Sequence, residues 1–227
     1  YGIYIHIPFC KQKCTYCDFY TVVAPSLIPS VIDGISKEIE LRKDYLPGKK
    51  ISTIYFGGGT PSILSKAQFL QIFESIYKYF DVDKKAEITF EANPDDLTDK
   101  FFQEISSLPF NRISIGIQSF NDTDLKRINR RHDGLQAMEA VLRARKYGFN
   151  NISIDLIYGL PGQSHEDWKK QLDQAMQLNA EHISSYGLTY EEGTVLWKQR
   201  SKGLVHTTED EVMIQMFDSL LVATKEN

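Results

Sequence analysis

The chain has 227 residues, of which 42% are hydrophobic, and a formal net charge of −4 at pH 7. This length suits one large domain with a full hydrophobic core. The acidic balance makes nucleic acid a poor default partner, and no apolar run is long enough to form an integral membrane segment.

The first predicted element is a strand over residues 1–8, in which isoleucines alternate with other side chains. A helix over residues 29–45 follows, and the strand-helix pattern then repeats. Further strands are predicted at 51–56, 87–91, 112–118, 151–157 and 181–188. Further helices are predicted after Ser65, over 98–108, after Asn121, over 134–147, over 164–178 and from about Thr208. Ser65 with Gln68, and Thr208 with Glu211, are typical of capping boxes that open helices.

The strict alternation of six strands with helices predicts a parallel α/β protein, either doubly wound or a barrel. In the strand over 112–118, three isoleucines oppose Ser114, Gly116 and Gln118. Strands between two helix layers are apolar on both faces, so a face of small and polar residues favours a barrel with helices outside only. We therefore expect one domain over residues 1–227, with a partly open barrel whose interior holds a ligand.

All three cysteines of the chain lie within residues 10–17, as Cys10, Cys14 and Cys17. Such crowding predicts a metal centre. A structural zinc ion needs four ligands, and His6 is the nearby candidate for the fourth. An iron-sulfur cube bound by three thiolates leaves one iron open to a substrate or cofactor. Buried thiols without a ligand are the third interpretation.

The cysteine content also bears on the cellular compartment. Three cysteines cannot all pair, and an oxygen-sensitive cluster needs a reducing environment, so we expect a cytoplasmic protein. The chain opens on Tyr1 within a strand pattern and stops at Asn227 just after an amphipathic run. We therefore expect a fragment, with a further C-terminal domain missing.

Three consecutive glycines, Gly57 to Gly59, come at the end of the second predicted strand and precede Thr60 and Pro61. They allow the backbone to approach a ligand closely, and their carbonyls can accept hydrogen bonds from an ammonium group. A phosphate-binding loop is disfavoured because no Gly-Lys-Ser or Gly-Lys-Thr follows. A plain strand-to-helix turn is the remaining alternative.

Polar side chains also occur where other strands end. Glu91 and Asp155 are carboxylates on the interior face, and ribose hydroxyls are suitable donors to them. Gln118 can both donate and accept. Arg130 can bind a carboxylate in a bidentate manner, or it is a solvated arginine at a helix end.

The spacing Cys10-x-x-x-Cys14-x-x-Cys17, with Tyr16 before the last cysteine, resembles the signature of the radical S-adenosylmethionine (SAM) superfamily. The flanking residues and the Gly-Gly-Gly-Thr-Pro run resemble its coproporphyrinogen III oxidase and HemW branch. The resemblance implies a six-stranded partial (β/α) barrel and a 4Fe-4S cluster on the three cysteines. SAM then chelates the open iron, and an electron from the cluster splits SAM to give a 5′-deoxyadenosyl radical. The matching SAM-binding positions are Tyr4, Gly58, Gly59, Thr60, Glu91, Gln118, Arg130, Asp155 and Thr189, while Tyr16 packs on the adenine.

This branch includes haem chaperones and oxygen-independent coproporphyrinogen III oxidases. The oxidases resemble Cys-x-x-x-Cys-x-x-Cys-x-Cys, and here Phe19 occupies the position of the last cysteine. The resemblance therefore favours a HemW-type chaperone that delivers haem, with the oxidase as the alternative. It implies haem or a porphyrinogen and an electron donor such as flavodoxin or ferredoxin as partners. A His-Asn-x-x-Tyr-Trp haem motif is expected beyond Asn227.

Overall fold

A computed structural model of the chain describes residues 1–48 and 50–226. Six strands form one sheet in the order β1-β2-β3-β4-β5-β6, and each neighbouring pair is parallel. The strands are β1 (Gly2–Ile7), β2 (Lys50–Gly58), β3 (Asp81–Ala92), β4 (Arg112–Gln118), β5 (Ile152–Tyr158) and β6 (His182–Gly187). Because order in the sheet equals order in the chain, the connections all wind the same way around it.

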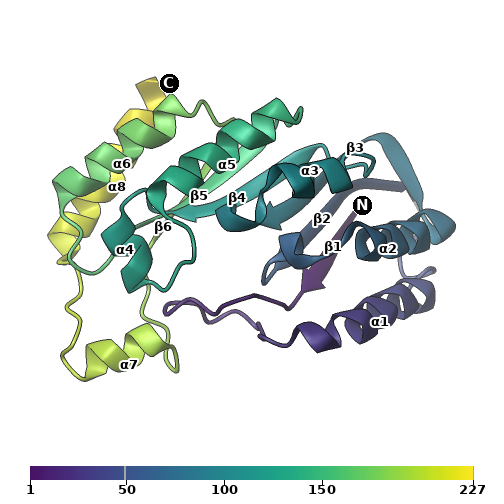
Figure 1. Cartoon of the computed structure of the whole chain (residues 1–227), viewed down its shortest axis with the longest axis horizontal. Coiled ribbons are helices and arrows are strands. Elements are labelled where there is room, and N and C mark those ends of the chain that lie inside the picture. The colour runs from purple at the N-terminus through teal and green to yellow at the C-terminus, as the bar shows by residue number, and fades with distance from the viewer. Residues whose placement is uncertain (49, 227) are drawn as a thin grey trace.

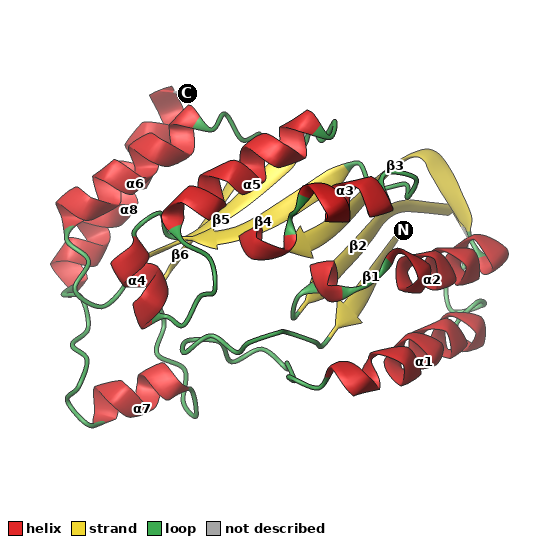
Figure 2. Ribbon diagram, viewed as in Figure 1, coloured by secondary structure: helices red, strands yellow, loops and turns green. Residues whose placement is uncertain are grey.

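In the described part of the chain, helices lie in every connection between neighbouring strands, two more follow β6, and most of them gather on one side of the curved sheet (Figures 1 and 2). They are α1 (Ile28–Leu41), α2 (Lys66–Tyr79), α3 (Asp99–Ile105), α4 (Asp122–Arg127), α5 (Gly134–Lys146), α6 (His165–Gln177), α7 (Val195–Ser201) and α8 (Asp210–Glu226). Short 3-10 segments lie at η1 (Pro25–Leu27), η2 (Pro61–Ile63) and η3 (Pro94–Asp96). No described helix has the length and apolar character needed to cross a membrane.

The two faces of the sheet differ as the sequence predicts. On β4 and β5 the side chains that face the helices are fully buried and apolar, including Ile115 and Ile154. The opposite face carries Thr89, Ser114 and Ser153, which are small and polar although each is less than 5% exposed. In the described residues β1 and β6 each pair with one neighbour only, so the sheet does not close. The predicted partial barrel is confirmed.

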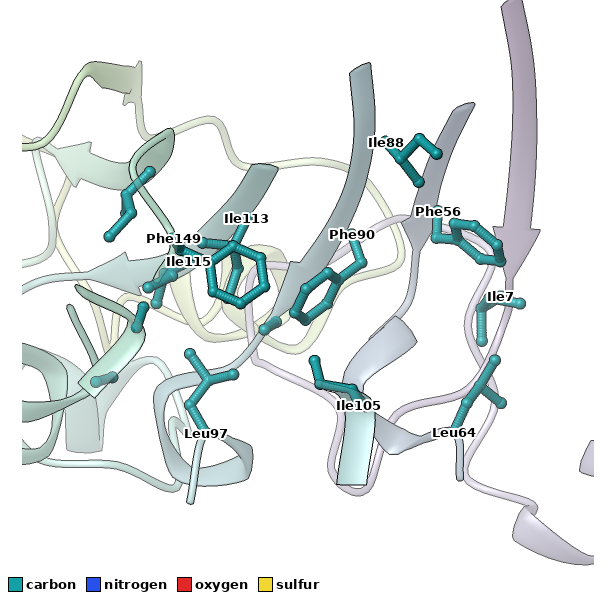
Figure 3. Packing of buried hydrophobic residues seen from close by; sticks show 14 of the residues in the cluster. Ile7, Phe56, Leu64, Ile88, Phe90, Leu97, Ile105, Ile113, Ile115 and Phe149 are labelled. Atoms are coloured by element: carbon teal, nitrogen blue, oxygen red, sulfur yellow. The ribbon is translucent and has the colours of Figure 1, made fainter. Parts of the chain in front are cut away.

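Aromatic side chains contact one another in the core beside β2 and β3, and Figure 3 shows Phe56 and Phe90 among isoleucines and leucines. Phe90 contacts Phe110 with ring centroids 4.6 Å apart, and Phe110 also contacts Phe56 at 5.5 Å and Phe69 at 5.1 Å. Tilted and edge-on ring pairs of this kind are favourable beyond the area they bury. This packing fixes β3, and therefore Glu91 directly after Phe90, against the helical layer.

The predicted helix over residues 29–45 is shorter in the structure. Helix α1 ends at Leu41, because the last buried position of its apolar stripe is Ile39. Strand β3 begins at Asp81, earlier than predicted, because Asp81 and Val82 pair with the start of β2. Residues 81–86, at the start of β3, show no alternation of apolar and polar side chains from which a strand could be predicted.

Two of the predicted helix starts can be compared directly. The capping box of Ser65 and Gln68 is present. The predicted box of Thr208 and Glu211 was wrong, since α8 begins at Asp210 and the Thr208 hydroxyl donates to the Gly159 carbonyl at 3.2 Å. Helix α7 was not predicted at all.

Candidate functional site

A cavity of about 480 Å³ is lined by residues of β2 to β6 and of the loop that follows β1. This volume is within the range of small-molecule sites. Most of the residues predicted from the sequence line it: Cys10, Cys14, Tyr16, Cys17, Gly58, Gly59, Thr60, Glu91, Gln118, Arg130, Asp155 and Thr189. Tyr4 does not line it. Its ring packs on Tyr55 with centroids 6.1 Å apart, and its hydroxyl bonds His6.

The cysteine loop, which we define as residues 8–22, leaves the end of β1 and returns to it. The Val22 amide donates to the Pro8 carbonyl at 2.7 Å, and the Cys10 amide donates to the Val22 carbonyl at 3.1 Å. Phe9 forms a parallel bridge with Val22 and is 1% exposed. The base of the loop is thus closed by backbone bonds and by a buried ring, which places Cys10 beside the sheet.

The far part of the cysteine loop rests on the segment that follows α4. The Thr15 amide donates to the Ile128 carbonyl at 3.1 Å. The Gln12 side chain donates to the Asn129 carbonyl at 2.9 Å, and the Asn129 side chain donates to the Lys13 carbonyl at 2.8 Å. The loop, drawn in purple, runs across to α4 in Figure 1. These contacts hold the three cysteines over the cavity.

Cys10, Cys14 and Cys17 all line the cavity from one loop, as the ligands of a single metal centre would. A structural zinc ion would need a fourth ligand, for which His6 is the nearby candidate. His6 is already engaged, with Nδ1 3.1 Å from the Tyr4 hydroxyl and Nε2 3.2 Å from the Tyr20 carbonyl oxygen.

The glycine loop, which we define as residues 57–61, begins in the last two residues of β2 and packs directly on β1. The Gly59 amide donates to the Ile7 carbonyl at 2.8 Å, and a Cβ on Gly59 would lie 2.7 Å from the Phe9 carbonyl oxygen. Gly58 has a φ of +108°, and a Cβ there would lie 2.6 Å from the His6 ring. Close packing inside the protein therefore already requires glycine at both positions.

Glu91, which lines the cavity, is held by two donors. The Tyr55 hydroxyl donates to Oε1 at 2.8 Å, and the Gly58 amide donates to Oε2 at 3.1 Å. Burial raises the pKa of Glu91 above its ordinary value, and the charge of Asp155 adds to this while both donors oppose it. A buried carboxylate gains most from further donors, so the site favours a ligand that supplies hydroxyl or ammonium groups.

Asp155 provides a second carboxylate on the same face. The Ser114 hydroxyl lies 3.3 Å from each of its oxygens. Burial is the main cause that raises the pKa of Asp155, while hydrogen bonds from Ser184 and Ser114 lower it. Two carboxylates in one cavity favour a ligand rich in donors, such as a nucleoside with its ribose hydroxyls.

Arg130 is used mainly by the protein itself. Its Nη2 donates to the Gly116 carbonyl at 2.5 Å and to Asn93 Oδ1 at 2.6 Å, and its Nη1 lies 3.5 Å from Cys14 Sγ. Its Nε is buried and has no partner among the described residues. The guanidinium is therefore not a solvated helix end, and the N–H of Nε is not used by these bonds.

Asn93 was missed by the sequence reasoning. It accepts from Arg130 and donates through Nδ2 to Thr60 Oγ1 at 3.2 Å, and Thr60 in turn donates to Cys10 Sγ at 3.2 Å. This chain of contacts joins β3, the glycine loop and the cysteine loop. The Asn-Pro pair after a strand is a turn signal, but no spacing rule reveals the partners of its side chain.

The backbone at Gln118 is unusual. Its φ is +69°, a region that residues with a Cβ adopt rarely. Strain of this kind is often found at binding sites.

Tyr16, expected to pack on an adenine, contacts a small apolar cluster of Ile128, Ile157 and Leu160 while still lining the cavity.

Comparison with known proteins decides the family. The family model for the radical SAM superfamily matches residues 4–175. The chain belongs to the radical SAM superfamily. Membership implies a 4Fe-4S cluster and SAM as cofactors, and the three cysteines beside a cavity with two carboxylates fit both.

Curated relatives narrow the resemblance. The chain is 37% identical over 219 residues to the haem chaperone HemW of Lactococcus lactis, covering 96% of this chain and 57% of that protein. It is 37% identical over 196 residues to HemW of Escherichia coli, covering 86% and 52%. The chain thus spans just over half the length of these relatives.

A solved structure agrees with this fold. Coproporphyrinogen III oxidase (HemN) from Escherichia coli, described as a radical SAM enzyme, superposes with a TM-score of 0.88 at 26% identity. The match covers 99% of this chain and 52% of that one.

A buried histidine beside the site leads to a prediction on pH. His132 Nε2 lies 2.9 Å from the Ile117 carbonyl oxygen, and Nδ1 is buried without a partner among the described residues. Burial lowers the pKa of His132 to about 4, and the charges of Arg130 and Arg131 also lower it. The charge of Asp133 raises it.

The unfolded value of about 6.5 is higher, so the unfolded chain binds more protons as the pH falls. The stability that neutral His132 contributes is complete above pH 6.5 and is lost as the pH falls towards 4. Between pH 7 and pH 5 this amounts to about 2 kcal/mol. Urea unfolding of the wild type and of His132→Gln at both pH values measures this difference. The free energy of unfolding of the variant should fall by about 2 kcal/mol less between pH 7 and pH 5 than that of the wild type. Equal pH slopes for the two proteins would contradict the assignment.

Proposed function

We propose that the chain is the radical SAM core, over residues 1–227, of a longer HemW-type protein that binds haem and delivers it to acceptor proteins. The observation that carries the proposal is Phe19. It is 66% exposed and lines the cavity, at the position where the resembling oxidases have a further cysteine. The names of the relatives at 37% identity support the same assignment.

In this proposal Cys10, Cys14 and Cys17 hold the cluster. A bound cluster supplies an electron that can cleave SAM reductively. Gly58, Gly59 and Thr60 bind the methionine part, and Glu91 and Asp155 accept hydrogen bonds from it and from the ribose. The remaining contacts are assigned to Tyr16, Gln118, Arg130 and Thr189, and Tyr4 acts from outside the cavity through its neighbour Glu91.

The alternative function is oxygen-independent coproporphyrinogen III oxidation. The likeness to HemN supports it, since the fold agrees over nearly the whole chain. Phe19 weighs against it because a phenylalanine can neither bind a metal nor exchange a proton. An oxidase would have to supply that chemistry from another residue.

The proposal includes a partner and a compartment. Cluster reduction requires a one-electron donor such as flavodoxin or ferredoxin. An oxygen-sensitive cluster on the three cysteines needs a reducing compartment, which we take to be the cytoplasm. Haem ligands are proposed to lie outside the described residues.

The first prediction for this function concerns Glu91. Loss of its charge removes charge-assisted hydrogen bonds, each contributing about 1.5–3 kcal/mol. Glu91→Gln should therefore raise the Kd of SAM by about one to two decades, with the iron content unchanged. Glu87→Gln is the matched control, because Glu87 lies on the same strand and is exposed. An unchanged Kd for SAM together with reduced stability would assign Glu91 a structural role instead.

The second prediction separates chaperone from oxidase. The anaerobically reconstituted protein, given SAM, a reductant and coproporphyrinogen III, should release no protoporphyrinogen, whereas HemN from Escherichia coli run in parallel should. Phe19→Cys should also remain inactive, because small misplacements of a substrate are costly. The longer protein should bind haem, measured by its Soret band. Turnover at rates similar to the HemN control would restore the oxidase assignment.

A further inference from the structure

A buried carboxylate outside the cavity connects the segments that build the site. The side chain of Asp96, in η3, is 1% exposed. Lys11 Nζ donates to Oδ1 at 2.5 Å, Arg131 Nη2 donates to the same oxygen at 3.2 Å, and the Ser62 hydroxyl donates to Oδ2 at 2.8 Å. Both oxygens are therefore used. An ionised group this deeply buried persists only where donors surround it.

The donors come from three parts of the site. Lys11 directly follows Cys10 in the cysteine loop, Ser62 comes two residues after Thr60 of the glycine loop, and Arg131 follows Arg130. Asp96 itself lies shortly after Glu91 and β3. None of the residues Lys11, Ser62, Asp96 and Arg131 is among the described residues that line the cavity. Direct contact with a ligand inside the cavity is therefore not their role.

The position of the cysteine loop relative to the sheet matters for a ligand that contacts both at once. Under the proposed function, SAM binds iron held by the cysteine loop and also the carboxylates of the sheet. The two sets of contacts reinforce one another only if their separation matches the ligand. The Thr60 hydroxyl also donates directly to Cys10 Sγ across the two loops, but hydrogen bonds to sulfur are weak.

We propose that Asp96 is a positioning residue, which sets the cysteine loop against the glycine loop through Lys11 and Ser62. This inference rests on the proposed function, since it concerns the binding of SAM. Breaking the link should leave each half of the site intact and weaken only a ligand that spans both. A ligand that does not bind the iron should bind as before, because Tyr16, the loop residue assigned to the adenine, packs on Ile128, Ile157 and Leu160.

The test compares SAM with 5′-deoxyadenosine, which lacks the methionine part. Lys11→Met removes the ammonium from a side chain that is 45% exposed, and it leaves Asp96 bonded to Arg131 and Ser62. On reconstituted protein, Lys11→Met should raise the Kd of SAM about tenfold while the Kd of 5′-deoxyadenosine and the iron content stay unchanged. Lys11→Arg should restore the affinity for SAM. Lys126→Met is the control, an exposed lysine on the neighbouring α4 without an ion pair among the described residues.

Ser62→Ala provides a second arm, and Asp96→Asn removes the negative charge to which Lys11 and Arg131 bind. Equal loss of affinity for SAM and for 5′-deoxyadenosine would assign Asp96 a merely structural role, and no loss for either ligand would overturn the inference. Wild-type protein that takes up no iron or binds no SAM would instead refute the proposed function. Should Asp96→Asn fail to fold, Lys11→Met and Ser62→Ala still decide the question.

Discussion

The parallel direction of all six strands is the constraint on which the site depends. Side chains far apart in sequence, such as Glu91 near the carboxyl end of β3 and Asp155 in the middle of β5, meet because the strands run in the same direction and both side chains lie on the inner face. The same constraint brings the cysteine loop, which follows β1, to the same end as the glycine loop that follows β2. Had one strand been antiparallel, its functional residues would face the opposite opening of the barrel.

Burial of carboxylates on the inner face follows from that arrangement. The pKa values of Glu91 and Asp155 are both raised, chiefly by burial, and each carboxylate already has donors from the protein. Fixed donors orient the oxygens, and a ligand can use the acceptor capacity that remains. The rigid outer layer of isoleucine and phenylalanine keeps these oxygens in place, because packed interiors yield little.

Strand positions and faces could be predicted from the sequence because they rest on a period of two over several residues. The capping box at Ser65 could be predicted because it is local. Helix α7 could not, since it is short and only Leu196 is buried. The capping box at Thr208 failed because a tertiary bond to Gly159 competes for the hydroxyl.

The membership of the site was largely predictable, whereas its internal contacts were not. The cysteines and the residues at strand ends are recognised by spacing and position. Asn93 and Asp96 act through partners distant in the chain, which no local pattern reveals. The position of Tyr4 outside the cavity depends on the course of β1 at the open edge of the sheet.

The central claim is that Cys10, Cys14 and Cys17 hold a cluster with one open iron for SAM. Mössbauer spectra of anaerobic protein reconstituted with ⁵⁷Fe, recorded with and without SAM, test it most directly. We expect a 4Fe-4S cluster in which one iron site alone changes its isomer shift when SAM is added. Zinc bound stoichiometrically without iron uptake, or a cluster whose irons do not respond to SAM, would contradict it.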